Sequence, residues 1–224
     1  MQECRVAAAA SLNPPRPGLH IPRGSRLGGA ASPGIRPAVF LDRDGILIRD
    51  VHYLRRASQI ELLPGVGSLQ ALQDAYYLVI ATNQSGVARG FLSEEHLLEI
   101  HGTLAAALAT AGLKIDAIYY CPHLEGAAVS AYRTSCGCRK PAPGMLQQAA
   151  SDWGIPLGAS WLIGDSARDV EAGYAAGLAG NFLVSESAAR TQVGHCVRTI
   201  EDAVRRIASE NRISASDCRS GLLK

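Results

Sequence analysis

The sequence has few charged residues and almost no net charge. Of its 224 residues, 19% are charged, and the formal net charge at pH 7 is +2. Proteins that bind nucleic acid through its phosphates concentrate lysine and arginine on one surface. This balance argues against such a surface, and we expect no nucleic-acid partner.

Long apolar runs are also missing. A membrane-spanning helix needs about 20 consecutive apolar residues, and no stretch approaches that length. The alanine run at residues 7–10 is too short for the apolar region of a signal peptide. We therefore expect a monomeric, cytoplasmic protein without membrane association. With 47% hydrophobic residues, the chain is long enough for one domain with an ordinary core.

Cysteine is too sparse for a small secreted fold held together by disulfides, since only six occur in the chain. Three of the six fall in one segment, where Cys121-x-His123 is followed by Cys136-x-Cys138. These residue types match a structural Cys₃His zinc site. The intervening loop has no helix or strand pattern, and ordering it costs about 1–2 kcal/mol per residue in backbone entropy. We predict that a bound Zn²⁺ holds this loop in place. The alternative is one buried cysteine plus a disulfide.

The first 36 residues differ in composition from the rest. They contain five arginines, one acidic residue, and prolines at positions 14, 15, 17, 22 and 33. Such a segment cannot bury enough apolar surface to fold, and its prolines would break the amphipathic helix of a transit peptide. We predict a disordered extension over 1–36, or a start codon placed too early, then a folded domain over 37–210 and a flexible tail over 211–224.

From Ala38 onward, apolar strands alternate with amphipathic helices. We predict strands at 38–41, 77–81, 115–120, 161–163 and 182–184. Helices are predicted from Pro64 to Leu72, between Ser93 and Gly112, and over 144–153, 168–176 and 200–208. This alternation predicts an α/β fold with a doubly wound, mainly parallel sheet. No insertion is long enough for a large cap domain.

Polar motifs follow the apolar strands or open the next helix. They are Asp42 with Asp44, Thr82, the Arg139–Lys140 pair, and Asp165 with Asp169. In a parallel sheet these positions converge on one edge, where ligands bind. Close carboxylates repel each other unless a hard cation such as Mg²⁺ lies between them. Each motif alone also fits a bland alternative: a polar turn, a helix cap, a solvated lysine or an exposed helix turn. Four motifs in this order favour an active site.

Together these motifs resemble the haloacid dehalogenase (HAD) superfamily of phosphotransferases. The segments that carry the resemblance are FLDRDG, ATNQSGVARG, YYCPH, CGCRKPAPGML and IGDSARD, within about 37–184. They are most similar to the family of D-glycero-D-manno-heptose 1,7-bisphosphate 7-phosphatases and histidinol phosphatases. The resemblance implies a HAD-like Rossmannoid fold, a phosphatase acting on a small phosphorylated sugar, and zinc at the four ligands named above. Histidinol phosphate is the alternative substrate.

A carboxylate nucleophile divides phosphate-ester hydrolysis into two easier steps through an aspartyl-phosphate. Asp42 is the candidate nucleophile and Asp44 the candidate general acid and base, and the resemblance assigns the same roles. Mg²⁺ would be held by Asp42, the backbone carbonyl of Asp44 and Asp165, with Asp169 in support. The resemblance implies that the transferred phosphoryl group is held by Thr82 and Lys140.

Substrate contacts are predicted beyond the catalytic motifs. Arg89 and Arg139 are suited to bidentate binding of a second phosphate. The other candidates are Arg43, Asp50, His52, Tyr53, Asn83, Gln84 and Ser85. Two positions depart from the family pattern: Ile46 replaces a usual Thr, and Ser166 stands where many relatives have Lys. Two further classes stay open, a catalytically silent binding module and a zinc-dependent interaction domain, although no motif acid is lost.

Overall fold

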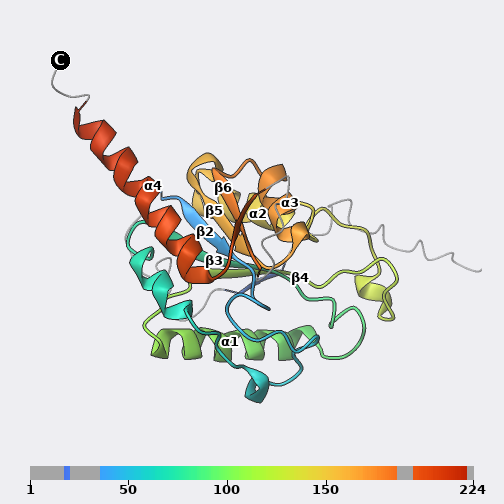
Figure 1. Ribbon diagram of the computed structural model, residues 1–224. Helices are drawn as coiled ribbons and strands as arrows, with labels where there is room; N and C mark the ends of the chain where they lie inside the picture. Colours follow the sequence, from blue (N-terminus) through green and yellow to red (C-terminus); the bar gives the residue numbers. More distant parts are fainter. Residues whose placement is uncertain (1–17, 21–35, 186–193, 221–224) are drawn as a thin grey trace, which may run out of the picture.

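The computed structural model of the protein describes residues 18–20, 36–185 and 194–220. Over these ranges the chain forms a seven-stranded sheet in the order β1-β4-β3-β2-β5-β6-β7 (Figure 1). All neighbouring strands are parallel except β1 and β4, so the predicted mainly parallel α/β fold is confirmed. The strands are β1 Gly18–His20, β2 Ala38–Leu41, β3 Tyr77–Asn83, β4 Ala117–Cys121, β5 Trp161–Gly164, β6 Gly180–Val184 and β7 His195–Val197.

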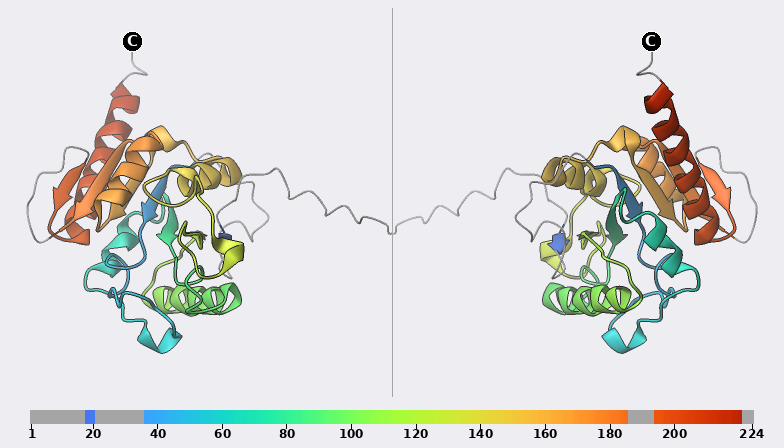
Figure 2. Two further views of the ribbon diagram at one scale, coloured as in Figure 1. Left: turned by 90° about the vertical axis from the view of Figure 1, so that its right-hand side faces the viewer. Right: turned by 90° about the vertical axis from the view of Figure 1, so that its left-hand side faces the viewer.

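Helices cover both faces of the sheet (Figures 1 and 2). They are α1 Glu94–Thr110, α2 Gly144–Trp153, α3 Ala167–Ala175 and α4 Ile200–Ser220. One apolar cluster contains residues of α1 and α4, and a second contains residues of α2 and α3. Neither the connections between strands nor the helices in the described ranges form a large cap domain. In the same ranges, no helix combines the length and apolarity needed to cross a bilayer.

Alternation along the central strands explains the two clusters. In β2, Val39 and Leu41 belong to the first cluster, whereas Ala38 and Phe40 belong to the second. Successive side chains of a strand point to opposite faces, so a strand buried on both sides reads as a continuous apolar run. That continuous run is what identified β2 in the sequence.

Local signals set the ends of α1 as predicted. The side chain of Ser93 accepts a hydrogen bond from the backbone N–H of His96, and two glutamates occupy the first turn. Acidic side chains there interact favourably with the positive end of the helix dipole. After the helix, Gly112 has a φ of 83°, in the left-handed region that glycine adopts without strain.

Two predicted helices differ in the structure. The segment after Pro64 forms a short 3₁₀ helix, Val66–Ala71, that follows a left-handed Gly65. Two glycines close together, Gly65 and Gly67, disfavour a regular α-helix here. α4 continues to Ser220, beyond the predicted helix end at 208 and into the predicted tail. The sequence contains no proline or glycine between Ile200 and Gly221 that would end it earlier.

Two short strands were not predicted. Gly18–His20 forms β1, so the prediction of disorder over 1–36 is wrong at these residues. The rest of that segment, up to residue 35, lies outside the described residues. His195–Val197 forms β7 at the other edge of the sheet. Both have three residues, too few to show a period-2 pattern.

Candidate active site

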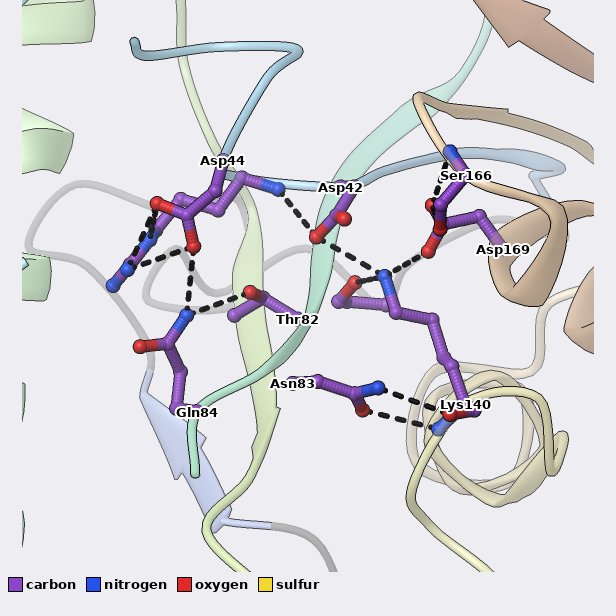
Figure 3. Close-up of polar contacts among 10 residues, drawn as sticks. Asp42, Asp44, Thr82, Asn83, Gln84, Lys140, Ser166 and Asp169 are labelled. Atoms are coloured by element: carbon purple, nitrogen blue, oxygen red, sulfur yellow. Dashed lines mark hydrogen bonds and ion pairs between the residues drawn. The ribbon is translucent and has the colours of Figure 1, made fainter. Parts of the chain in front are cut away.

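The carboxyl ends of three neighbouring strands, β3, β2 and β5, bring the predicted motifs together (Figure 3). Asp42 directly follows β2, and its backbone N–H donates to the carbonyl of Ile163 in β5 over 3.0 Å. Asp42 Oδ1 accepts from the backbone N–H of Arg43 over 2.7 Å and lies 3.0 Å from Lys140 Nζ. Burial raises the pKa of Asp42 to about 6, although the charge of Lys140 opposes this rise.

Lys140 is a buried cation of the site, as is Arg43. Its ammonium donates to the carbonyl of Ala81 over 2.7 Å and lies 2.5 Å from Asp169 Oδ1, in addition to its contact with Asp42. Burial alone would lower the pKa of Lys140, but the charges of Asp42 and Asp169 outweigh it and the pKa is raised. Lys140 is therefore charged at neutral pH, between two carboxylates.

The backbone of Lys140 is held by Asn83. The Asn83 amide donates to the Lys140 carbonyl and accepts from the Lys140 N–H, both over 3.0 Å. The sequence predicted Asn83 as a substrate contact, but the hydrogen bonds of its amide go to Lys140 (Figure 3). Asn83 therefore positions Lys140.

Three carboxylates form a cluster beside Lys140. Oxygen atoms of Asp42, Asp165 and Asp169 lie within 4.8 Å of one another. Asp169 is fixed by Ser166, whose N–H and hydroxyl donate to Asp169 Oδ2 over 3.0 and 2.6 Å. A Cβ at Gly45, which has a φ of +78°, would lie 2.0 Å from Asp165 Oδ2. Glycine at this position is thus needed for the close approach of Asp165.

This carboxylate cluster fits a hard divalent cation. Burial and the charges of Asp42 and Asp169 raise the pKa of Asp165 to about 7. The raised pKa values of Asp42 and Asp165 show that these two carboxylates are short of positive charge, whereas Lys140 lowers the pKa of Asp169. Oxygen donors are the ligands that Mg²⁺ prefers. Because Asp169 also pairs with Lys140, its role as a support rather than a direct ligand stays a prediction.

Asp44 points away from Asp42 and toward the strand-end residue Gln84 (Figure 3). The Arg43 guanidinium donates to both oxygens of Asp44, over 2.9 to 3.2 Å. The amide of Gln84 donates to Asp44 Oδ2 over 3.0 Å and to Thr82 Oγ1 over 2.9 Å. Gln84 therefore couples the candidate acid and base to the candidate phosphoryl-binding hydroxyl of Thr82.

A pocket of about 280 Å³ opens beside Asp44. The structure brings every predicted substrate contact to its walls: Arg43, Asp50, His52, Tyr53, Asn83, Gln84, Ser85, Arg89 and Arg139. They come from the irregular segment after β2, the loop after β3 and the turn before α2. Sequence segments up to about 100 residues apart therefore meet in one pocket.

An edge-on aromatic pair joins the segment after β2 to the segment after β3 beside this pocket. The rings of Tyr53 and Phe91 are 4.8 Å apart in an edge-on arrangement. The guanidinium of Arg89 lies 5.6 Å from the Tyr53 ring, and that of Arg55 lies 4.1 Å from the Phe91 ring. Such cation–π contacts restrain arginines at a surface. Arg89 is therefore held at the pocket rim by the segment opposite it.

Two residues near the pocket were not predicted. Arg168, the second residue of α3, lines the pocket and is exposed, and among the described residues it makes no hydrogen bond or ion pair. Its place in IGDSARD, one turn past Asp165, was a signal that could have found it. His101 in α1 is fully buried, with Nε2 3.4 Å from Nη1 of Arg43. No sequence signal separated it from an ordinary core residue.

The four predicted zinc ligands converge beneath the turn that leads to Lys140. Their sulfur atoms lie 3.3 to 3.5 Å apart, and His123 Nδ1 lies 3.4 to 3.7 Å from Cys138 and Cys121. Metal–ligand distances of 2.0–2.3 Å in a tetrahedral zinc site place ligand atoms about 3.5–3.8 Å apart. None of these cysteines forms a disulfide, which the alternative interpretation required. The donor set and spacing fit zinc.

Contacts tie this cysteine loop to the pocket. Arg139 Nη1 donates to the carbonyl of His123 over 3.3 Å. Tyr120 and Tyr132 both donate to the carboxylate of Glu94, over 2.7 and 2.8 Å, and so join β4 and the loop to the start of α1. The loop therefore supports Arg139 and, through the chain, Lys140.

Comparison with known proteins gives consistent results. The family described as "HAD-hyrolase-like" matches residues 137–207. A D-glycero-beta-D-manno-heptose-1,7-bisphosphate 7-phosphatase from Rhodopseudomonas palustris is 43% identical over 152 residues, which cover 67% of this chain and 84% of the relative. The enzyme of the same name from Vibrio cholerae is 38% identical over 167 residues, covering 74% and 90%.

A solved structure is similar over most of its length. The D,D-heptose 1,7-bisphosphate phosphatase from B. bronchiseptica, complexed with magnesium and phosphate, superimposes with a TM-score of 0.67 and 30% identity. The match covers 78% of this chain and 99% of that one. The fold and the sequence motifs thus point to the same group of proteins.

Proposed function

This chain belongs to the HAD superfamily, in the family of D-glycero-D-manno-heptose-1,7-bisphosphate 7-phosphatases, and from this membership we propose that it hydrolyses the C7 phosphate of a heptose 1,7-bisphosphate. The family resemblance seen in the sequence is confirmed, and the chain is a phosphoric monoester hydrolase. The observation that carries the substrate proposal is the pocket. There Asp44 lies beside Arg89, Arg139 and Arg168, and none of these arginines forms an ion pair with another described residue.

The first step uses Asp42 as nucleophile. Among the described residues, the hydrogen bond from the Arg43 N–H and the ion pair with Lys140 both use Oδ1, so we assign the attack on phosphorus to Oδ2. An aspartyl-phosphate forms as the bond between phosphorus and the C7 oxygen breaks, and Asp44 protonates the departing oxygen. The buried charge of Lys140 stabilises negative charge on the phosphoryl oxygens during transfer.

The second step releases phosphate. Asp44, now ionised, removes a proton from a water molecule that attacks the aspartyl-phosphate, and the carboxylate of Asp42 is restored. Thr82, fixed by Gln84, donates to the transferring group in both steps. Mg²⁺, when bound by Asp42, Asp165 and the Asp44 carbonyl with support from Asp169, supplies positive charge that offsets the charge of the phosphoryl group.

Zinc has a structural role in this proposal. The closed Cys₃His donor set leaves no position for a substrate, so Zn²⁺ would hold the loop that carries Arg139 and Lys140. The unbridged thiols suit a reducing compartment, in agreement with the proposed cytoplasmic location. We further propose that the enzyme acts as a monomer, without a nucleic-acid or membrane partner. The folded phosphatase domain is proposed to span 37–210.

Histidinol phosphate is the competing substrate. Its imidazole and amine would need an acidic contact, and Asp50 lines the pocket. However, an Asp50 oxygen accepts the N–H of His52 over 2.7 Å, and arginines outnumber acids on the pocket wall. The charge of the pocket therefore favours a substrate with a second anionic group.

Phosphate release with Mg²⁺ tests the proposal, using both anomers of heptose 1,7-bisphosphate, histidinol phosphate and other sugar phosphates. Asp42→Asn should abolish release, and Asp74→Asn, an isosteric change of an exposed residue before β3, should not. Preferred release from heptose 1,7-bisphosphate supports the proposal. Preferred release from histidinol phosphate transfers the assignment to that substrate, and release that survives Asp42→Asn contradicts the mechanism.

A further inference from the structure

Arg43 is a buried cation within the active site. Its side chain is 1% exposed and is the largest fully buried side chain of the described residues. Its ion-pair partner is Asp44, 2.9 Å away and 25% exposed. A buried charge is costly unless each of its donors has a partner, so the surroundings of Arg43 decide its orientation.

The other side of the Arg43 guanidinium faces His101. His101 Nε2 lies 3.4 Å from Arg43 Nη1, whereas Nε and Nη2 of the arginine donate to Asp44. Arginine is only a donor, so Nε2 must accept, which requires a neutral imidazole with its proton on Nδ1. The His101 ring is held edge-on to Tyr120, with centroids 5.3 Å apart. Arg43 is thus fixed between two acceptors on opposite sides.

Because the guanidinium of Arg43 is planar, its contact with His101 also restrains its contact with Asp44. Its donors have a rigid geometry, so a contact that fixes Nη1 also fixes the fork that binds Asp44. Gln84 restrains Asp44 from another direction through Oδ2. The orientation of the Asp44 carboxylate therefore depends on a residue of α1 that does not line the pocket.

We propose that His101 is a positioning residue for proton transfer, which acts through Arg43 to hold Asp44 in its acid and base orientation. This inference rests on the proposed function of Asp44. A purely structural role for His101 is the competing interpretation, since the neighbouring buried positions of α1 include Ile100 and Leu104. The two interpretations differ in what they predict for substrates that need no proton from the enzyme.

An ester with a good leaving group separates these interpretations. The alkoxide of a sugar needs protonation as it departs, whereas p-nitrophenolate departs without it. The rate of aspartyl-phosphate formation is measured by rapid quench. In His101→Leu this rate should fall about 10- to 100-fold for the sugar ester, because general acid catalysis contributes roughly 10²- to 10⁴-fold and the variant loses only part of that contribution. Formation from p-nitrophenyl phosphate should change less than about threefold, and KM for either ester should not change.

Conservative variants keep the test sharp. His101→Gln offers an amide oxygen to Arg43 and should restore most of the rate with the sugar ester. The side chain of His101→Asn is too short for this contact, so this variant should show the loss expected for His101→Leu. It replaces His101→Leu in the test if the leucine variant fails to fold. Leu104→Ala, one turn along the same buried face, should lower the Tm but leave the ratio of the two rates unchanged.

Equal losses on both esters, or no loss on the sugar ester, would overturn the role of His101. The sugar ester used is whichever one the wild type hydrolyses, so a wrong substrate assignment appears separately, in the wild-type rates. A wild type that forms no aspartyl-phosphate from any ester overturns the proposed function together with this inference.

Discussion

Lys140 is the counter-ion of Asp42, with its ammonium nitrogen 3.0 Å from Oδ1 and with both side chains buried. Replacing Lys140 with Met removes the charge that opposes the raised pKa of Asp42, so the nucleophile becomes harder to ionise. We expect aspartyl-phosphate formation to fall at least about 10²-fold, as for other groups that stabilise charge in a transition state. Leaving two buried carboxylates unpaired should lower the unfolding free energy by about 3–5 kcal/mol.

Rapid-quench kinetics and urea unfolding measure these two effects. Lys114→Met is the matched control, because Lys114 is exposed in the turn before β4, at the other end of the sheet. A Lys140→Met protein with a wild-type rate would rule out Lys140 as the charge partner of the reaction.

Stability without added magnesium should depend on pH in a definite direction. The pKa of Asp42 is raised to about 6 and that of Asp165 to about 7, above the ordinary value of 3.8. The folded protein therefore binds these protons more tightly than the unfolded chain. Their stabilising contribution is complete below about pH 4 and is lost as the pH rises through 6 and 7. We expect the Tm to fall over this interval, and Mg²⁺ to raise it more at pH 8 than at pH 5.

Thermal unfolding of the zinc-loaded protein at several pH values, with and without Mg²⁺, measures this dependence. Asp165→Asn should reduce both the pH slope and the shift caused by Mg²⁺, whereas Asp74→Asn should reproduce the wild type. If Asp165→Asn retains the full shift, Asp165 is not part of the cation site.

Arg168 should contribute to affinity for a second phosphate. It lines the pocket without a hydrogen bond or ion pair to the rest of the described chain, so its donors are available to a ligand. A hydrogen bond to a charged group contributes at least about 1.5 kcal/mol, so Arg168→Ala should raise KM for the bisphosphate by roughly tenfold. The KM for heptose 7-phosphate, which lacks the second phosphate, should stay constant.

Steady-state kinetics with the two substrates give this comparison, and Lys114→Ala controls for the loss of a positive charge. An equal rise in KM for both substrates would place Arg168 at the transferred phosphate instead.

Removing one of the proposed zinc ligands should affect the pocket as well as the loop. In Cys136→Ser the thiolate ligand is lost, and we expect the bound zinc, one per chain in the wild type, to fall well below one. Because Arg139 and Lys140 follow the Cys136-x-Cys138 pair, kcat should also fall. Elemental analysis, thermal unfolding and kinetics measure these effects, with Cys196→Ser in β7 as the control. A zinc-free variant with wild-type kcat would separate the loop from catalysis.

The sequence sufficed for the fold class and for the convergence of the catalytic motifs. The reason is topological: Asp42, Thr82 and Asp165 follow or end β2, β3 and β5, which are neighbours in the sheet. Once alternating strands and helices are recognised, parallel strands place their carboxyl ends together without knowledge of any side-chain contact.

The roles of the individual polar residues could not be predicted from the sequence in the same way. An asparagine next to a motif threonine can bind a ligand or a backbone, and only the tertiary fold shows that Asn83 holds Lys140, 57 residues away. His101 fits the apolar face of α1 in sequence, and its partner Arg43 is 58 residues distant. Such contacts depend on packing between elements, which local patterns do not encode.

β1 covers one edge of β4 and is itself the edge strand of the sheet. It pairs antiparallel with β4 along Gly18–His20, so β4, which ends at the proposed zinc ligand Cys121, is an interior strand. Both margins of the sheet are thereby formed by strands of only three residues, β1 and β7. Short edge strands offer a poor template for pairing with another chain. Deleting the first 20 residues would uncover the backbone hydrogen-bonding groups of β4 and favour self-association at concentrations where the full chain stays dispersed.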